Sequence, residues 1–419
     1  CNKNDIIHVM FILYNLIYIF LLPLLILRDL ITIDENKLKT ILQKLGKSYA
    51  EPTAASIWLH GVSLGEIKIL STLAKRLDHQ GNKVLITSTT NTGRAELEKN
   101  FSDSNIKFLP FPYDLNFVHK KIINNYKIKK IVLFESEFWP NLLSLSSDVK
   151  IISLNTSISD QSFSRYKSMK FFTSFIFTKI DLFLAQSKET INRLNFLGAT
   201  NTKLLRNMKI NPENYLTDEN KKNKYAKILA TDVLNIVLGS SHKGEEEFVI
   251  DALKGLKLNL ILAPRHPERI DSVLQVVKSK GYKSAKVSEV EQYDQIKDTD
   301  NKTITIFDEV GDLINLYAVA DLAIVAGSII YERGHNFMEP IFADTLCITG
   351  SKLRNYKQLK KDLCDSNIIE TFDTKNQLRA LVVKYKDSKI RNEKLLAQKK
   401  TLDELSGSYK LIIDSINDI

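Results

Sequence analysis

Glu66 lies where an apolar run, residues 56–60, passes through a glycine-bearing turn into a helix-like segment. Ser63 and Glu66 fit the S-x-x-E pattern of a capping box, in which a hydroxyl and a carboxylate bind free amides of the first helical turn. The same carboxylate is suited to general-base chemistry, because a positioned Asp or Glu can take a proton from a hydroxyl group. The pattern by itself favours the capping role, and both roles stay open.

Two further acids, Glu135 and Glu137, follow the apolar run 130–134 within the segment FESEFWPN. If a strand continues through them, residues two apart share a face and the two carboxylates point into one cleft. The alternative is a pair of solvated acids at a strand end, next to a proline that begins a helix.

Polar and basic residues follow the apolar runs of the second half of the chain. GSSHKGEEE, residues 239–247, places Ser241 and His242 at a helix start, where free amides and the helix dipole favour an anion. APRHPER, residues 263–269, adds Arg265 and His266, and an arginine fork matches phosphate oxygens. The two segments predict a phosphate site, with a solvated surface loop as the alternative.

A glycine-bearing segment, residues 326–340, carries Gly334 and His335 and then Asn336 and Glu339 three residues apart. This spacing predicts an amide and a carboxylate on one helix face. Such a pair is suited to a ribose diol or the edge of a base. A helix cap followed by a first-turn acid is the alternative.

These residues follow short apolar runs that alternate with longer helix-period segments, which is the pattern of βαβ units around a parallel sheet. Open sheets of this kind bind ligands beyond the carboxyl ends of their strands, where the candidate residues fall. The runs form two sets and predict two sheets. The first set is 56–60, 83–87, 106–110, 130–134, 150–154 and 181–185, and the second is 235–239, 258–263, 303–307, 321–326 and 345–349.

The polar, proline-containing stretch 211–228 predicts a linker between two domains. We therefore expect an N-terminal anchor at 1–30, a first Rossmann-like domain at 48–210 and a second at 229–390. A charged, helix-like segment at 391–419 is expected to cross back to the first domain.

Residues 6–27 are almost continuously apolar and are followed by basic residues. The run reaches the ~20 residues needed to cross a bilayer core, and the basic residues after it predict a cytoplasmic body. Because a small-residue cleavage site is lacking, an uncleaved anchor that spans or lies on the membrane is favoured over a signal peptide. A buried core helix is the alternative.

The chain of 419 residues carries 59 Lys plus Arg against 49 Asp plus Glu, a net charge of +10. This excess suits anionic partners. Without a basic stripe interleaved with aromatics or zinc-finger spacing, we expect no nucleic-acid partner. The cysteines Cys1, Cys347 and Cys364 form no C-x-x-C pair, which suits a reducing compartment.

The order of the motifs is more informative than any one of them. HGVSLGE, FESEFWPN, GSSHKGEE, PRHPER, DEVGDL with LYAVADLAIVAGS, and GHNFMEP occur in this order along the chain. In order and approximate spacing the chain resembles the 3-deoxy-D-manno-octulosonic acid (Kdo) transferases over nearly its whole length. The resemblance implies an α/β GT-B fold, with two Rossmann-like domains facing a central cleft and an N-terminal membrane-associating helix.

The resemblance also implies an inverting transfer of Kdo from CMP-Kdo to the tetraacylated lipid A precursor, at the cytoplasmic face of the inner membrane. The resemblance implies no metal in the transfer step and no cofactor besides the donor substrate CMP-Kdo. The first domain is then the acceptor domain, and the second holds the CMP-sugar.

Residue by residue, the resemblance implies that Glu66 is the general base and that Glu135 and Lys209 support the transition state. The implied CMP site is formed by Pro264, Arg265, Val310, Gly311, Asp312, Asn336, Phe337, Met338 and Glu339. Other candidates near these motifs are Ser63, Gly65, Ser241, His242, His266, Gly334 and His335.

The chain departs from the family pattern at several positions. Arg206 and Arg333 stand where relatives usually carry glycine, and a β-carbon there restricts the backbone angles that glycine permits. Ser157 and Gln161 replace arginines, which bears on acceptor recognition, and Asp312 replaces a glutamate.

Two other functions remain open on the sequence. One is another enzyme of the same fold, either a nucleotide-sugar epimerase or a glycosyltransferase with a UDP donor. The other is a membrane-anchored protein that binds anions or lipids without catalysis.

Overall fold

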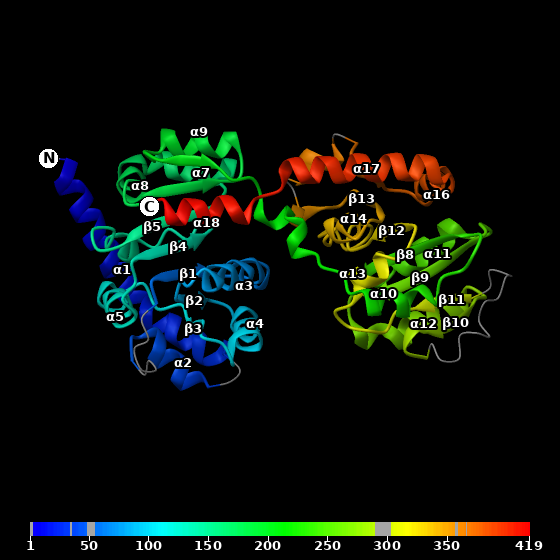
Figure 1. Ribbon diagram of the computed structural model, residues 1–419, viewed down its shortest axis with the longest axis horizontal. Helices are drawn as coiled ribbons and strands as arrows, with labels where there is room; N and C mark the ends of the chain where they lie inside the picture. The colour runs from blue at the N-terminus through cyan, green and yellow to red at the C-terminus, as the bar shows by residue number, and fades with distance from the viewer. Residues whose placement is uncertain (1–2, 34–35, 48–54, 290–302, 357–358, 366) are drawn as a thin grey trace. The chain divides into compact units, whose positions relative to one another are not determined.

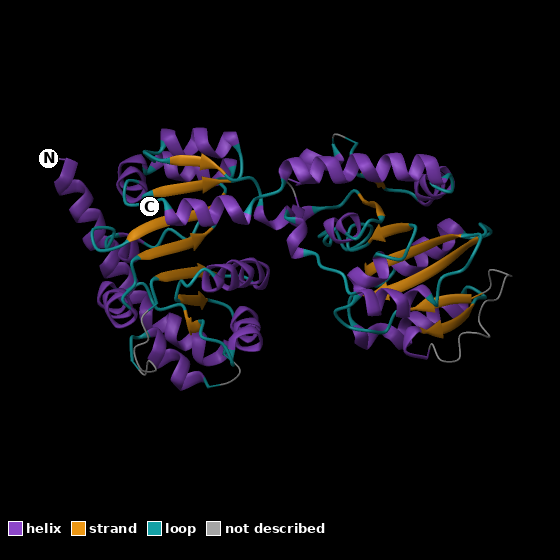
Figure 2. Ribbon diagram, viewed as in Figure 1, coloured by secondary structure: helices purple, strands orange, loops and turns teal. Residues whose placement is uncertain are grey.

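Two parallel sheets organise the chain, each within its own unit. The computed structural model describes residues 3–33, 36–47, 55–289, 303–356, 359–365 and 367–419, so Cys1 lies outside the described residues. Unit 1 comprises Cys1–Asn214 and Ser406–Ile419, and unit 2 comprises Tyr215–Leu405. In each unit helices cover the sheet (Figure 1, Figure 2). The two predicted sheets are thereby confirmed.

The sheet of unit 1 has seven parallel strands in the order β3-β2-β1-β4-β5-β6-β7. The strands are β1 (Ile57–Gly61), β2 (Val84–Ser88), β3 (Lys107–Pro110), β4 (Lys130–Phe134), β5 (Lys150–Thr156), β6 (Leu182–Ala185) and β7 (Thr202–Leu204). The helices are α1 (Lys3–Thr32), α2 (Lys37–Lys44), α3 (Leu64–His79), α4 (Asn91–Phe101), α5 (Asn116–Tyr126), α6 (Pro140–Leu143), α7 (Asp160–Ser168), α8 (Lys170–Phe177), α9 (Lys188–Phe196), η1 (Met208–Ile210), η2 (Pro212–Asn214) and α18 (Tyr409–Asn417).

The sheet of unit 2 also has seven parallel strands, in the order β10-β11-β9-β8-β12-β13-β14. The strands are β8 (Leu234–Ser241), β9 (Leu258–Pro264), β10 (Lys283–Lys286), β11 (Thr303–Ile306), β12 (Leu322–Val325), β13 (Leu346–Gly350) and β14 (Glu370–Phe372). The helices are α10 (Glu219–Ala226), α11 (Glu245–Leu253), η3 (Pro267–Arg269), α12 (Ile270–Ser279), α13 (Leu313–Tyr317), α14 (Met338–Phe342), η5 (Arg354–Tyr356), η6 (Lys360–Cys364), α16 (Lys375–Lys384) and α17 (Ser388–Leu405).

Every strand expected from an apolar run is present, but β7, β10 and β14 were not expected. Each of these lies at an edge of its sheet. Their sequences, TKL, KSAK and ETF, are short and mostly polar. An edge strand pairs on one side and borders water on the other, so it needs no continuous apolar run and gives little signal in the sequence.

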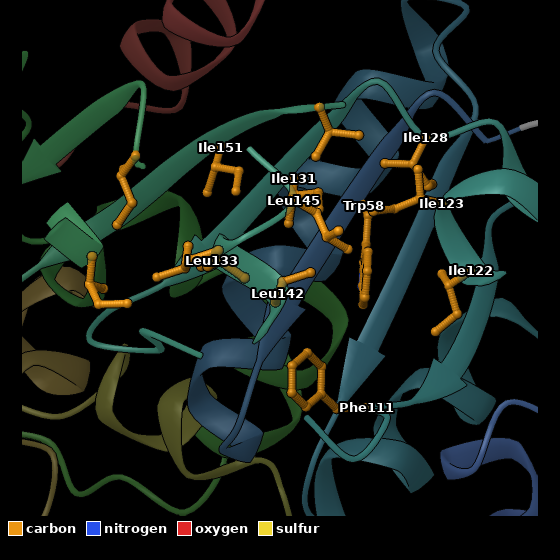
Figure 3. Packing of buried hydrophobic residues seen from close by; sticks show 14 of the residues in the cluster. Trp58, Phe111, Ile122, Ile123, Ile128, Ile131, Leu133, Leu142, Leu145 and Ile151 are labelled. Carbon is orange, nitrogen blue, oxygen red and sulfur yellow. The ribbon is translucent and has the colours of Figure 1, made fainter. Parts of the chain in front are cut away.

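The sheet of unit 1 buries side chains on both faces. Trp58 and its partner Ile131 on β4 belong to one apolar cluster, while the next pair, Leu59 and Val132, belongs to the other. Figure 3 shows the first cluster, where Trp58 lies among the isoleucines and leucines of the sheet and its flanking helices. Burying each large apolar side chain stabilises the fold by about 1.5–3 kcal/mol. Because both faces of these strands are buried, continuous apolar runs predict them, and not an alternation of apolar and polar residues.

The C-terminal helix α18 adds to the second of these clusters. Its Tyr409, Ile412 and Ile416 are buried beside residues of the unit 1 sheet. In Figure 1 this helix lies next to β4 and β5, although it ends the chain. The segment from Ser406 onward thus belongs to unit 1.

The unit boundaries differ from the expected domain boundaries at two places. Residues 215–228, expected as a linker, belong to unit 2 and form α10, and residues 391–405 belong to unit 2 within α17. The physical reason in the first case is Tyr225, which is fully buried and packs edge-on against Phe307 with ring centroids 5.4 Å apart. This buried aromatic residue helps to anchor an otherwise polar stretch to the unit.

The apolar N-terminal run forms α1. Within it His8–Thr32 is long and apolar enough to cross a membrane by length and composition. Its outer face exposes large apolar side chains, among them Phe20, which is 80% exposed. This helix is not the buried core helix that the sequence left as an alternative.

Candidate functional site

The predicted base and its supporting acid lie at the point where the unit 1 sheet changes direction. The chain runs outward from β1 through β2 to β3, and then returns to β4 on the other side of β1. Glu66 follows β1 and Glu135 follows β4, and these strands are neighbours. Such a switch point leaves a crevice at the carboxyl ends of two adjacent strands, where open α/β sheets bind ligands.

Glu66 caps helix α3 and is held rigidly by doing so. Its Oε1 accepts a hydrogen bond from the Ser63 hydroxyl at 2.7 Å, and its Oε2 accepts one from the Val62 amide at 2.7 Å. Ser63 in turn accepts from the Glu66 amide at 3.4 Å. The predicted cap is confirmed, with the amide of Val62 in place of the cap residue's own. Glu66 is 7% exposed, and two donors occupy two of the roughly four lone-pair positions of a carboxylate.

Gly65 lies in the first turn of α3, next to Glu66. A β-carbon built there would contact nothing within 4 Å. The local packing of unit 1 therefore gives no steric reason for glycine at this position.

Glu135 and Lys209 come together in unit 1. The Lys209 Nζ lies 2.5 Å from the Glu135 Oε1, and both side chains are partly exposed. Glu135 has a φ of 60°, and its amide donates to the Leu154 carbonyl at 2.7 Å. Lys209 is placed by η1, where the Met208 amide donates to the Asn155 Oδ1 at 2.9 Å. The backbone on both sides therefore directs the two side chains toward each other.

Glu137 has different partners from Glu135. Strand β4 ends at Phe134, so the two acids lie in the following turn and do not share a strand face. The Glu137 Oε2 accepts from the Trp139 Nε1 at 2.8 Å and lies 3.6 Å from the His60 Nε2. Pro140 begins α6, as the proline-based alternative predicted.

The switch point of the unit 2 sheet lies between β8 and β12. His242 follows β8, and His335 lies in the loop after β12. Their Nε2 atoms are 2.8 Å apart, and the Tyr331 ring stacks on His242 at 3.9 Å between centroids. Burial lowers the pKa of His335 to about 4, and burial also lowers the pKa of His242. Two neutral rings can share one proton in this contact, one as donor and the other as acceptor.

Glu245 holds the two loops of this switch point together, and the sequence did not single it out. Its Oε2 accepts from the amides of His242 at 2.9 Å and Gly327 at 2.8 Å. Its Oε1 accepts from the amides of Ile329 at 3.0 Å and Ile330 at 3.1 Å. The run of three glutamates in GSSHKGEEE marked a helix start, but nothing in it distinguished the buried Glu245 and Glu246 from the exposed Glu247.

The PRHPER segment presents one arginine outward and uses the other internally. Arg265 and His266 are exposed after Pro264, which ends β9. Arg269 instead lies 2.9 Å from the buried Glu246. The Ser241 hydroxyl also donates to Glu246, at 2.7 Å. Arg265 is thus suited to bind an anion, whereas Ser241 and Arg269 belong to a buried network.

Asp312 pairs with a residue of the stretch that was expected as a linker. Its Oδ1 lies 2.5 Å from the Lys221 Nζ, and its Oδ2 accepts from the Tyr225 hydroxyl at 3.2 Å. Gly311 has a φ of 87° and Val310 is exposed. Lys221 was not expected as a partner of Asp312, because the polar composition of 211–228 predicted a linker.

Asn336 and Glu339 contact each other, but not as two residues of one helix. Helix α14 begins at Met338, so Asn336 precedes it. The Asn336 Nδ2 donates to the Glu339 Oε1 at 3.2 Å and to the Tyr215 hydroxyl at 3.3 Å. Phe337 and Met338 are buried. The side chains of Asn336 and Glu339, and the backbone of the residues between them, are what this segment can offer a ligand.

The family departures have mixed structural consequences. Arg206 has a φ of 76°, so its β-carbon lies in the left-handed region that favours glycine. At Arg333, the second departure, the positive φ values belong to its neighbours Glu332, at 65°, and Gly334, at 73°. The expected restriction at Arg333 is therefore wrong. Ser157 and Gln161 are exposed.

No group of three or more His, Cys, Asp or Glu side chains among the described residues is placed to hold a metal ion. The candidate groups that the structure does bring together are instead ion pairs and hydrogen-bonded clusters. The candidate residues in them follow strands of the two sheets, as at β1, β4, β8 and β12.

Residues 39–211 match the model of the family described as 3-deoxy-D-manno-octulosonic-acid transferase (kdotransferase). A 3-deoxy-D-manno-octulosonic acid transferase of Haemophilus influenzae is 27% identical over 376 residues, which cover 87% of each chain. The chain is thus similar to Kdo transferases over most of its length. A bifunctional glycosyltransferase/methyltransferase of Fusobacterium nucleatum is 33% identical over 341 residues, or 78% of this chain and 52% of that protein. The chain thus spans about half the length of that relative.

A solved structure agrees with the fold of this chain. A glycosyltransferase from Rickettsia africae matches with a TM-score of 0.53 and 16% identity, over 87% of this chain and 97% of that one. At this identity the likeness concerns the fold alone. The two parallel seven-stranded α/β sheets form a GT-B glycosyltransferase fold, as the sequence resemblance implied.

Proposed function

We propose that this protein is an inverting glycosyltransferase that moves Kdo from CMP-Kdo to the tetraacylated lipid A precursor. Similarity to the Kdo transferases supports the reaction class. The observation that carries the mechanism is Glu66, a nearly buried carboxylate fixed at the switch point of the unit 1 sheet. Unit 1 is assigned the acceptor and unit 2 the nucleotide sugar.

In the proposed step Glu66 accepts the proton of an acceptor hydroxyl. The hydroxyl oxygen forms a bond to the anomeric carbon of Kdo, and the bond from that carbon to the phosphate oxygen breaks. CMP departs with the electron pair. The two hydrogen bonds from Val62 and Ser63 orient the carboxylate and leave other lone pairs for this proton.

The CMP group is assigned to the strand-end loops of unit 2. Arg265 is exposed and offers a planar fork to the departing phosphate. Pro264, Val310–Asp312 and Asn336–Glu339 are assigned to the remainder of CMP, by their position in the family motifs. The leaving group is a phosphate monoester whose charge Arg265 can offset, so the proposed transfer step uses no metal.

The protein is proposed to act at the inner membrane with its catalytic body on the cytoplasmic side. The exposed apolar face of α1 supports a membrane contact. The basic residues that follow the apolar run support the orientation.

The test is incubation of the purified protein with CMP-Kdo and the tetraacylated precursor, followed by mass spectrometry of the lipid. A Kdo mass increment is expected, and the number of increments counts the transfers. Lipid that gains no Kdo mass would sink the proposal. Binding of CMP but not of UDP would separate this function from that of a UDP-dependent enzyme. Lipid binding without release of CMP would indicate the non-catalytic alternative.

Glu66→Gln tests the base. Loss of the proton acceptor is expected to lower kcat by ~10²–10⁴-fold. The matched control is Ser187→Ala, which removes a helix N-cap elsewhere in unit 1, where Ser187 accepts from the Thr190 amide at 3.1 Å. The control is expected to lose about 1 kcal/mol of stability and to keep its activity. Near-normal turnover of folded Glu66→Gln would count against the assignment.

A further inference from the structure

Helix α1 is attached to unit 1 along one face rather than joined to it at one end. From Tyr14 to Ile33, residues three or four apart are half-buried or buried, while the opposite face is exposed. Polar contacts run from Tyr14 to Asp29, where the Tyr113 hydroxyl donates to the Asp29 Oδ2 at 2.8 Å. At 1.5 Å per residue this attachment extends over about 22 Å. The helix is therefore part of unit 1 and not a flexible tether.

The main polar junction is Asp114, in the loop between β3 and α5. The Asp114 Oδ2 accepts from the Tyr14 hydroxyl at 2.7 Å, and the Asp114 amide donates to the Tyr18 hydroxyl at 2.8 Å. Asp114 is completely buried. Two successive turns of α1 thus bind a single buried residue.

The same carboxylate binds the start of α6. Its Oδ2 accepts from the Asn141 amide at 3.1 Å and its Oδ1 from the Leu142 amide at 3.1 Å. The His119 Nε2 lies 2.8 Å from Oδ1. With the Tyr14 hydroxyl, four donors surround the carboxylate, which matches its roughly four lone-pair positions.

The segment that Asp114 holds is the start of α6, which directly follows an acidic turn at residues 135–139. Glu135 and Glu137 lie between β4 and α6, and Trp139 precedes the first residue of α6. The Asn141 side chain reinforces the link, because its Nδ2 donates to the Asp114 carbonyl at 2.6 Å and to the Asn15 Oδ1 of α1 at 2.9 Å. The position of α1 and the position of the acidic turn are thus set by one set of hydrogen bonds.

We propose that Asp114 is a positioning residue through which docked α1 holds the acidic turn, residues 135–139, in its productive geometry. The proposal deepens the function above and rests on it for its effect on catalysis. Membrane contact is a separate property of α1, because the apolar side chains face outward and Tyr14 faces Asp114. Loss of the Tyr14 hydroxyl therefore disturbs the turn without removing the apolar face.

The test compares Tyr14→Phe with Tyr113→Phe. Both variants remove one tyrosine hydroxyl from the attachment of α1, but the Tyr113 hydroxyl binds Asp29 and not Asp114. Hydrogen–deuterium exchange of the segment containing Asn141 and Leu142 gives a readout that does not depend on activity. Flotation with phosphatidylethanolamine–phosphatidylglycerol vesicles measures membrane binding, and Kdo transfer gives kcat and KM.

Tyr14→Phe is expected to speed exchange at the amides of Asn141 and Leu142 and to lower kcat on the order of 10-fold, since small misplacements of catalytic groups are costly. Its vesicle binding and its KM for the donor should match wild type. Tyr113→Phe should leave exchange at these two amides unchanged.

Equal effects of both variants on exchange would mean general loosening of α1 and would overturn the proposal. Unchanged exchange in Tyr14→Phe, or a loss of activity that follows a loss of vesicle binding, would overturn it as well. If the wild-type protein transfers no Kdo, the proposed function fails. The exchange comparison still decides whether Asp114 links α1 to the turn.

Discussion

The Lys209 ammonium lies 2.5 Å from a carboxylate oxygen of Glu135, although the two residues follow different strands of the unit 1 sheet. Both side chains are partly exposed, and exposed ion pairs contribute about 0–1 kcal/mol to stability. The pair therefore adds little to the fold. Its position beside the switch point, where Glu66 also lies, is consistent with the proposed role in catalysis.

Lys209→Met and Glu135→Gln are each expected to lower kcat/KM by ~10²-fold, the effect of losing one preorganised electrostatic group. The double variant should lose little more than either single variant, because the two groups act as one pair. The measurement is steady-state Kdo transfer together with thermal unfolding of each variant.

The matched control is Lys203→Met, on β7, the strand that precedes Lys209 in the chain. Lys203 makes an exposed contact with Asp418 at 4.0 Å, so its loss should leave both activity and stability near wild type. A loss of activity in the Lys209 variant that is accompanied by an equal loss in the control would argue against a specific role for the pair.

Arg206→Gly is expected to stabilise unit 1. Arg206 has a φ of 76°, and a left-handed conformation costs a residue with a β-carbon roughly 1–2 kcal/mol. Glycine removes this cost but increases the entropy of the unfolded chain, which offsets about 0.5–1 kcal/mol. The net gain in the free energy of unfolding should be between about 0 and 1.5 kcal/mol, measured by denaturant titration.

Arg333→Gly provides the contrast, because the positive φ values of its segment fall on Glu332 and Gly334. Here glycine brings the entropic cost without relief of strain, so a loss of about 0.5–1 kcal/mol is expected. The same sign of change in both variants would contradict the backbone explanation.

Acidification should lower the free energy of unfolding through the protonation of His335. Burial lowers its pKa to about 4 from an ordinary value of 6.5, so in the unfolded chain it takes a proton near pH 6.5 while in the folded chain it stays neutral to about pH 4. The unfolded state thus binds more protons in this window, and the free energy of unfolding falls as pH drops from 6.5 to 4.

His335→Asn should reduce this slope, by at most ~1.4 kcal/mol per pH unit, the value for one proton. The buried environment also lowers the pKa of His242, which contributes in the same direction, so part of the slope should persist. The slope is measured by unfolding each protein at a series of pH values between 7 and 4. An unchanged slope in the variant would show that His335 does not carry the effect.

Much of the fold could be predicted because buried parallel strands require continuous apolar runs. The run 130–134 appears in the structure as β4 with the same bounds, and the run 258–263 appears as β9, which ends one residue later. The edge strands β7, β10 and β14 escaped prediction because one side of each borders water, so that short polar segments suffice.

For the candidate site, the sequence alone determined which residues follow the central strands and, at Ser63 and Glu66, a cap whose partners lie within a few positions. Tertiary structure decided the partners of every group whose contact is distant in the chain. The pairs of Glu135 with Lys209 and of Asp312 with Lys221 are of this kind, as is the junction at Asp114. Local hydrogen bonds follow from spacing along one element, whereas these contacts exist because the fold brings strand-end loops against other loops and helices that are distant in the chain.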